Sequence, residues 1–247
     1  MKKIVFLLSM PLVLLTAVSV SATPITFTGS SGSLAASANF SVVGGNLQVI
    51  LTNTSSADVL VSSEVLTAVF FTVAGNPALA PVSALLSGGS TVIYGPQPAG
   101  GNVGGEWAYA NGLAGAPGGA DEGISSSGFG LFGPPNLFPG PDLDPPASPN
   151  GVNYGLLSAG DNSATGNAGV TGSPLINNQV TFMLAGLAVG FDPATGITTV
   201  SFQYGTALTE TNVPGVPGPI PEPTTILLLG SGLSGLAWYG RKKFFKK

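Results

Sequence analysis

The chain has 247 residues, with 7 Lys and Arg, 11 Asp and Glu, and neither His nor Cys. All seven cations lie at positions 2–3 and 241–247, so residues 23–240 carry a net charge of −11 and no basic side chain. This composition excludes disulfides, thiol nucleophiles, Ser-His-Asp catalysis and His- or Cys-based zinc sites. It also excludes nucleic acid as a partner, because phosphates are neutralised by Lys and Arg.

The first 22 residues have the organisation of a secretory signal peptide. Lys2 and Lys3 form a charged start, residues 4–18 form an apolar segment, and Val20-Ser21-Ala22 is a small-residue cleavage site. We therefore expect export through the Sec translocon and cleavage between Ala22 and Thr23.

Residues 23–212 show the pattern of an all-β domain. Apolar residues alternate with polar ones from Ile25 to Leu51, which predicts a β-hairpin that turns at Gly44-Gly45-Asn46. Further strands are predicted at 59–61, 65–73, 91–94, 106–110, 152–157, 180–184 and 200–204. About ten short strands separated by Gly, Pro and Asn favour an antiparallel β-sandwich or a jelly-roll-like domain.

Two Gly- and Pro-rich segments interrupt this pattern. Residues 112–151 predict a long surface loop, since Pro removes a backbone donor and Gly loosens the backbone. The loop also contains apolar residues that can pack it onto the domain, namely Phe129, Leu131, Phe132, Leu137 and Phe138. Residues 213–220 predict a linker between the domain and the C-terminal tail.

The tail, residues 221–247, has three consecutive parts. Pro221, Glu222 and Pro223 form a stiff acidic tripeptide, and residues 224–240 contain no charge and predict a single transmembrane helix of minimal length. A basic end follows and is expected to stay in the cytoplasm. It consists of Arg241, Lys242, Lys243, Lys246 and Lys247.

This order of motif, apolar span and basic end resembles the sorting tail of PEP-CTERM proteins. The matching elements are Pro221-Glu222-Pro223, the core LLLGSGLSGLA and the Arg-Lys-Lys end. PEP-CTERM proteins are substrates of exosortase, a membrane protease and transpeptidase of Gram-negative bacteria. The resemblance implies a precursor anchored in the inner membrane, processing near the tripeptide, and delivery to the cell surface or the extracellular space.

The body is also similar to an uncharacterised family of exosortase-dependent surface proteins. The likeness rests on the segments ITFTGSSGSLAASANFSV, LTNTSSADVLVSSEVLTAVFF, SSSGFGLFGP, PASPNGVNYGLLSAGD and VSFQYGTALTE. It implies a location and no activity.

Three kinds of site can be built from the remaining residue types. Trp107 and Tyr109 lie two apart on a strand, so they share one face and form either part of the core or a platform that stacks on sugars. Carboxylates suit Ca²⁺, and the weak candidate ligands are Asp121, Glu122, Asp142 and Asp144. Asp142 with Asp144, or Asp121 with Glu122, are also candidate pairs for a glycosidase, which needs two carboxyls across the scissile bond.

The sequence thus predicts an exported, non-enzymatic surface protein with a structural role in the envelope, the exopolysaccharide matrix or a biofilm. It predicts no metal or cofactor. A carbohydrate-binding surface module is the alternative, and a carboxylate-based secreted glycosidase is the second alternative.

Overall fold

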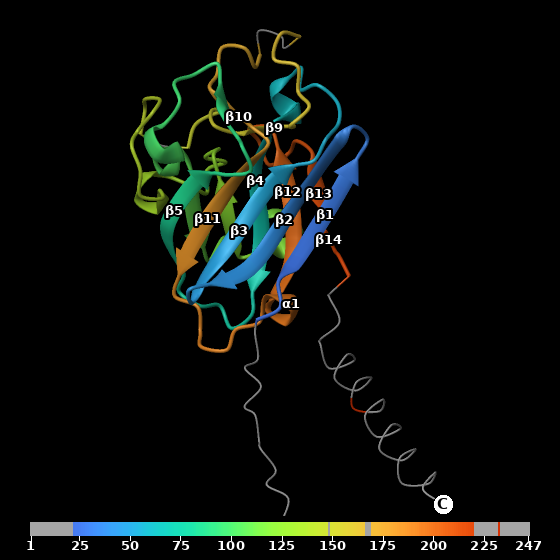
Figure 1. Ribbon diagram of the computed structural model, residues 1–247, viewed down its shortest axis with the longest axis vertical. Coiled ribbons are helices and arrows are strands. Elements are labelled where there is room, and N and C mark those ends of the chain that lie inside the picture. Colours follow the sequence, from blue (N-terminus) through green and yellow to red (C-terminus); the bar gives the residue numbers. More distant parts are fainter. Residues whose placement is uncertain (1–21, 148, 166–168, 220–231, 233–247) are drawn as a thin grey trace, which may run out of the picture.

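Two β-sheets form the body of the protein (Figure 1). The computed structural model describes residues 22–147, 149–165, 169–219 and 232. The first sheet is antiparallel and has the order β14 (Val216–Pro217), β1 (Ile25–Ser31), β2 (Leu34–Val43), β3 (Asn46–Asn53), β11 (Gln179–Ala185) and β5 (Ala80–Leu86). The predicted all-β class with antiparallel pairing is confirmed for this sheet.

The second sheet is mostly antiparallel. Its main path is β13 (Asn212–Pro214), β12 (Ile197–Tyr204), β4 (Leu66–Val73), β9 (Leu156–Leu157), β10 (Leu175–Asn177) and β6 (Val92–Ile93). Two further strands, β7 (Ala108–Asn111) and β8 (Glu122–Ser125), extend from β4. In the described part of the chain, helices are short segments of about one turn. One of them, α1 (Pro193–Gly196), precedes β12.

The first sheet follows from the alternating sequence. In β3 every second residue is buried, and β2 shows the same alternation in its central part. Val43 pairs with Asn46, so Gly44 and Gly45 form a two-residue turn, and both have a positive φ. Such a turn requires left-handed backbone at both positions, which glycine adopts without steric cost. A second turn at Gly32 and Ser33 divides the predicted hairpin, which therefore has three strands.

Strand β4 explains the position of the long loop. All but one of its eight residues are buried, because both of its faces are covered. One face meets the first sheet, where Phe71 contacts the ring of Phe40 with centroids 5.2 Å apart. On the other face, Phe70 packs against Phe129 and Phe132 of the 112–151 segment. The expectation that aromatic residues hold this segment on the domain is confirmed.

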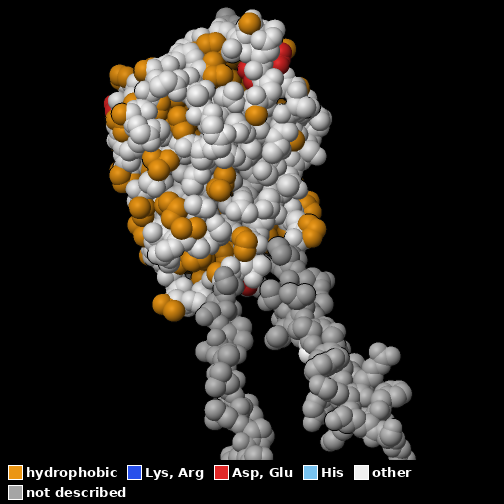
Figure 2. Space-filling view, in the orientation of Figure 1, with side chains coloured by type: hydrophobic (Ala, Val, Ile, Leu, Met, Phe, Trp, Pro, Cys, Tyr) orange, Lys and Arg blue, Asp and Glu red, His pale blue; other side chains and the backbone are white. Residues whose placement is uncertain are grey.

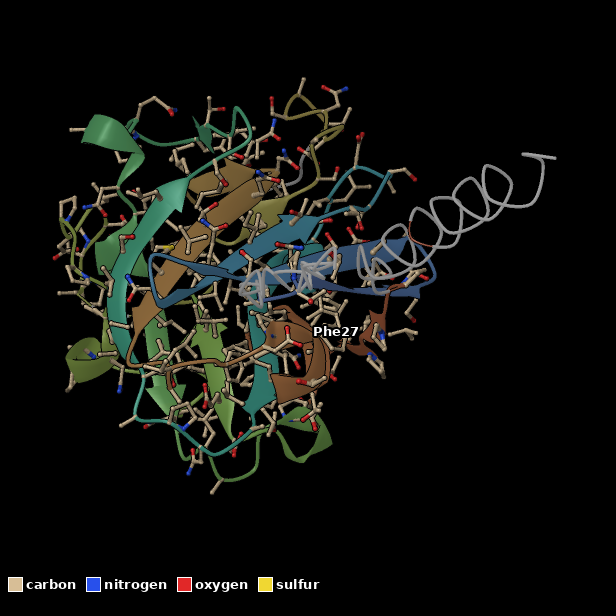
Figure 3. All side chains as sticks on the ribbon, turned by 60° about the horizontal axis from the view of Figure 1, so that its bottom comes forward. Phe27 is labelled. Atoms are coloured by element: carbon tan, nitrogen blue, oxygen red, sulfur yellow. The ribbon has the colours of Figure 1, made fainter. Side chains whose placement is uncertain are left out.

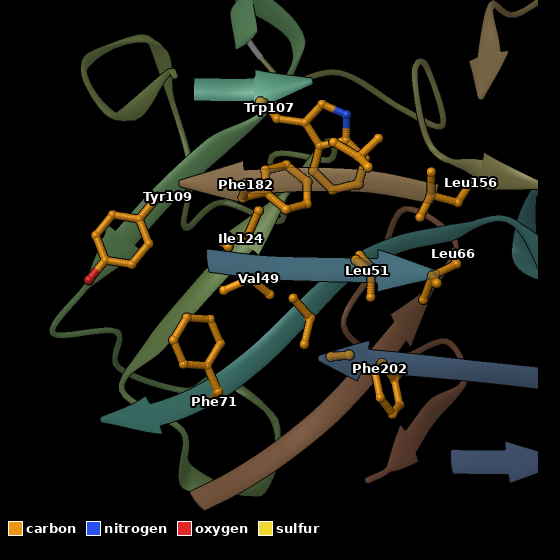
Figure 4. Close-up of a cluster of buried hydrophobic side chains, with 14 of the residues drawn as sticks. Val49, Leu51, Leu66, Phe71, Trp107, Tyr109, Ile124, Leu156, Phe182 and Phe202 are labelled. Atoms are coloured by element: carbon orange, nitrogen blue, oxygen red, sulfur yellow. The ribbon is translucent and has the colours of Figure 1, made fainter. Parts of the chain in front are cut away.

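The centre of the core lies between the sheets (Figure 4). Phe182 of β11 lies 4.9 Å from Trp107 and 5.3 Å from Phe138, measured between ring centroids. All three side chains are fully buried. Phe182 of the first sheet thus packs between Trp107, which precedes β7, and Phe138 of the 112–151 segment. This contact brings together three parts of the chain that are distant in sequence.

Several local predictions differ from the structure. Residues 59–61 are not a strand: Val59 is buried, but Leu60 and Val61 are exposed. Strands β5, β10, β13 and β14 were not predicted, and β8 lies inside the segment predicted as a loop. These strands are short or have neighbours distant in sequence, so their local pattern is weak.

The two predicted targeting segments lie outside the described residues, apart from Ala22 of the signal peptide and Gly232 of the apolar span. In the part of the chain that is described, no helix is long and apolar enough to cross a bilayer.

Replacing Phe182 by Ala should destabilise the domain by about 3–5 kcal/mol, because it leaves a cavity beside two buried rings. The control is Val82→Ala on the adjacent strand β5, where the side chain is 42% exposed. Its cost should stay below about 1 kcal/mol. Urea unfolding of residues 22–219 measures both, and equal losses would contradict this description of the core.

Candidate functional site

The chain leaves the domain through a short segment that joins the two sheets. β13 pairs with β12 of the second sheet, and β14, two residues later, pairs with β1 of the first. The amide of Gly215 donates to the carbonyl of Val200 at 2.8 Å, and that of Gly218 donates to Thr26 at 2.7 Å. The stretch 213–220, for which the sequence predicts a linker, is therefore paired with the domain as far as Gly218.

This crossing requires glycine at position 29. A Cβ atom there would lie 2.6 Å from the carbonyl oxygen of Pro214 and 3.0 Å from Cγ1 of Val213. Both distances are shorter than normal contact, so any side chain would push β13 away from β1. Gly29 thus allows the last strands to close the open side of the domain.

An apolar groove of about 850 Å³ lies beside this crossing. Figure 3 labels Phe27, one of its lining residues. β1 contributes Ile25 and Phe27, and β12 contributes Ile197 and Val200. Pro214, Pro217 and Gly218 line the remaining side, and no lining residue carries a charge. The groove therefore has no charged group for acid–base chemistry; its lining is mainly apolar, with hydroxyl and amide side chains from Thr198, Ser201 and Asn212.

A local irregularity in β12 shapes the groove. The pairing with β4 shifts between Thr198 and Ser201, and Thr199 has φ 52°. A β-branched residue in left-handed backbone is uncommon and marks a bulge. The bulge leaves the Val200 carbonyl to accept from Gly215, which fixes the rim of the groove. Sequence reasoning missed this groove because its residues come from both ends of the domain.

Trp107 and Tyr109 belong to the core. Trp107 has no exposed surface, and Tyr109 is 3% exposed. Figure 4 shows both in the buried cluster, with Trp107 beside Phe182. Neither ring offers a face to solvent, so the two residues do not form a platform for sugars. This corrects the carbohydrate-stacking alternative for these positions.

Glu122 is a buried carboxyl at the start of β8. It has no exposed surface, its Oε2 accepts a hydrogen bond from the Tyr109 hydroxyl at 3.0 Å, and its Oε1 has no hydrogen-bond partner among the described residues. Burial, reinforced by the charge of Asp121, raises the pKa of Glu122 to about 7, although the Tyr109 hydrogen bond opposes the shift. Burial also raises the pKa of Tyr109.

Asp142 and Asp144 lie in a different environment. Glu106, which is 4% exposed, accepts hydrogen bonds from the amides of Leu143 at 2.6 Å and Asp144 at 3.1 Å. Asp144 accepts a hydrogen bond from the side chain of Asn153. Burial raises the pKa of Glu106 against the effect of the two amides. Glu106 thus fixes the 142–144 segment, a role that no sequence pattern indicates.

The two carboxylate pairs do not assemble into one cation site. Within the described ranges, no group of three or more Asp or Glu side chains is placed to hold a metal ion. Oδ1 of Asp121 is buried and has no hydrogen-bond partner among the described residues. Asp142, in contrast, is exposed to solvent.

The part of the chain that follows the groove is recognisable by comparison. The family model of the PEP-CTERM protein-sorting motif matches residues 219–242, directly after the last paired residue Gly218. Searches against curated proteins and against solved structures gave no significant match. The chain thus contains a PEP-CTERM sorting domain, which indicates exosortase-dependent sorting of a secreted surface protein and implies export, a membrane-anchored precursor and processing by the membrane protein exosortase.

The buried carboxyl of Glu122 gives a pH prediction. Its folded-state pKa of about 7 lies above the ordinary value of 4.5. Between these values the folded protein binds more protons than the unfolded chain, so stability falls as pH rises through this window. The loss is at most about 1.4 kcal/mol per pH unit and levels off above pH 7.

Glu122→Gln should flatten this dependence in urea unfolding of residues 22–219 between pH 4.5 and 8. Asp142→Asn, at an exposed carboxylate, is the matched control; it should lose only a small part of the wild-type slope, because the Asp142 charge adds to the raised pKa of Glu106. An unchanged slope in Glu122→Gln would contradict the assignment.

Proposed function

We propose that this protein is a non-enzymatic component of the cell envelope or of an extracellular polysaccharide matrix. Its domain is a β-sandwich, and the sorting tail delivers that domain to the outer surface. The observation that carries the proposal is the direct junction between a closed β-domain and a PEP-CTERM motif, with Gly218 paired and the motif beginning at residue 219. The partners are the Sec translocon, exosortase and, at the destination, an exopolysaccharide.

Three features support a role without catalysis. Residues 4–240 contain no His, Cys, Lys or Arg, so thiol and amine nucleophiles and the bases that usually activate a hydroxyl are missing. The carboxyl with the most strongly raised pKa, that of Glu122, is sealed in the interior away from any substrate. The apolar groove is lined without charge.

The first test concerns the sorting tripeptide. Glu222→Ala should block processing, because it removes the only charge between the domain and the apolar span. An epitope tag after Lys247 should then stay joined to the domain and fractionate with the inner membrane. Asp142→Asn, which neutralises a distant carboxylate, should be processed normally. If Glu222→Ala loses its tag at the wild-type rate, the tail is a plain anchor.

The second test concerns cations. We propose that the domain needs no metal and that apolar packing supplies its stability. A few millimolar Ca²⁺ should therefore raise the melting temperature of residues 22–219 no more than an ionic-strength-matched control salt. A specific site would stabilise the folded state in proportion to RT ln(1 + [L]/Kd). A rise of many degrees that is lost in Asp142→Asn/Asp144→Asn would refute the proposal.

A further inference from the structure

Both boundaries of the domain lie at the same end of the molecule (Figure 1). The Thr23 amide donates to Oδ1 of Asp192 at 2.7 Å, which holds the first described residues against the turn that precedes α1. The Gly218 amide donates to Thr26, three residues further along β1. The chain therefore enters and leaves the domain at neighbouring points, and this end is called the exit end below.

The tether from the exit end to the predicted membrane span is very short. Only residues 220–223 separate Pro219 from Thr224, where the apolar span begins. Even a fully extended chain of this length reaches at most about 18 Å. A compact domain of this size has a radius of gyration of about 16 Å, so its opposite end lies about 40 Å away. In an anchored precursor, the exit end must face the bilayer.

The surface of the exit end is apolar. Residues 186–191 form the loop between β11 and α1, and at its tip Val189 is fully exposed. Leu187, Val189 and Phe191 line a hollow of about 460 Å³ together with Val42; Ala22 also lines it here and is expected to leave with the signal peptide. The hollow has one carboxylate, Asp192, which accepts the hydrogen bond from Thr23.

Glu64 and Glu210 lie at the opposite end, whereas Asp192 lies at the exit end and the buried Glu122 pairs with Phe71 near it. Val73, the last residue of β4, pairs with Ile197 next to α1. At the other end of β4, the amide of Gly205 donates a hydrogen bond to the carbonyl of Val65. Glu64 directly precedes β4, and Glu210 binds the amides of residues 206 and 207 next to Gly205. Figure 2 shows Asp and Glu side chains mainly at the upper end, whereas hydrophobic side chains are spread over this face from the upper end to the exit end. The exposed 186–191 loop and the short tether, and not the charge distribution, therefore distinguish the exit end.

We propose that the exit end rests on the lipid bilayer in the anchored precursor, with the 186–191 loop placing Val189 in the lipid interface. This inference rests on the proposed function, in which the precursor is anchored in the membrane. It adds which surface of the domain contacts the lipid. One valine and its neighbours are too few to bind a membrane from solution. They are enough to orient a domain that the tether already holds there, and processing would release this contact.

The chain has no Cys, so a single introduced cysteine carries a unique label. The chain expected after signal-peptide cleavage, residues 23–247, with Val189→Cys is labelled with an environment-sensitive fluorophore and reconstituted into phosphatidylcholine–phosphatidylethanolamine vesicles that contain brominated lipid. The matched control is Leu60→Cys, which is 42% exposed and lies near Glu64 at the opposite end. Vesicle flotation reports anchoring separately.

The proposal predicts that both variants float and that brominated lipid quenches the label at position 189 at least two-fold more than the label at position 60. Equal quenching in floating vesicles would overturn the docking surface and leave the anchor intact. If the spectrum of the label at position 189 changes with rising protein concentration in the absence of lipid, the surface binds a second copy of the chain. That result would overturn the proposal. Failure to float would overturn the anchor itself.

Discussion

Apolar packing between two sheets is the interaction on which the rest of the domain depends. Between positions 4 and 240 the chain has no Lys, Arg, His or Cys, so side-chain ion pairs and disulfides are not available to the domain. The rings of Trp107, Phe138 and Phe182 form the centre of the packing, and each comes from a different part of the sequence. Burying such side chains stabilises a fold by about 1.5–3 kcal/mol each. The long Gly- and Pro-rich segment 112–151 therefore contributes to the hydrophobic core through Phe138.

The closure of the domain follows from that packing. Residues 212–218 connect the two sheets, since β13 pairs with β12 and β14 pairs with β1. Gly29 allows the crossing, and Gly215 and Gly218 donate hydrogen bonds to opposite sheets. The sorting motif then begins within one residue. This arrangement separates a domain that completes its own structure from a tail that directs its transport.

Sequence patterns predicted those features that are encoded locally. The alternation in β2 and β3, the Gly44–Gly45 turn and the buried run in β4 each depend on neighbouring residues. The tail was predicted from its order of motif, span and charge, and the family comparison confirms its sorting motif. For Trp107 and Tyr109 the sequence allowed either a place in the core or a platform for sugars. Their spacing of two puts both on one face of a strand but does not specify whether that face is covered. Their burial depends on β11 and the long loop, which are distant in sequence.

Other features could not be predicted for related physical reasons. β14 has two residues and is a strand only because β1 lies beside it, and its Pro217 reads as a linker residue. The apolar groove combines residues 25–27 with residues 194–218. Glu122 and Glu106 are both buried, and nothing near them in sequence distinguishes a buried carboxylate from a solvated one. The contacts that decide these cases are made by tertiary structure.

The central claim is that the β-domain is complete at Gly218 and is delivered intact by the tail that follows. The most direct measurement is the intact mass and C-terminal sequence of the protein released to the cell surface. The account predicts a C-terminus beyond Gly218, so that β13 and β14 remain in the mature product. A mature C-terminus within residues 212–217 would remove part of the crossing segment and would contradict the account.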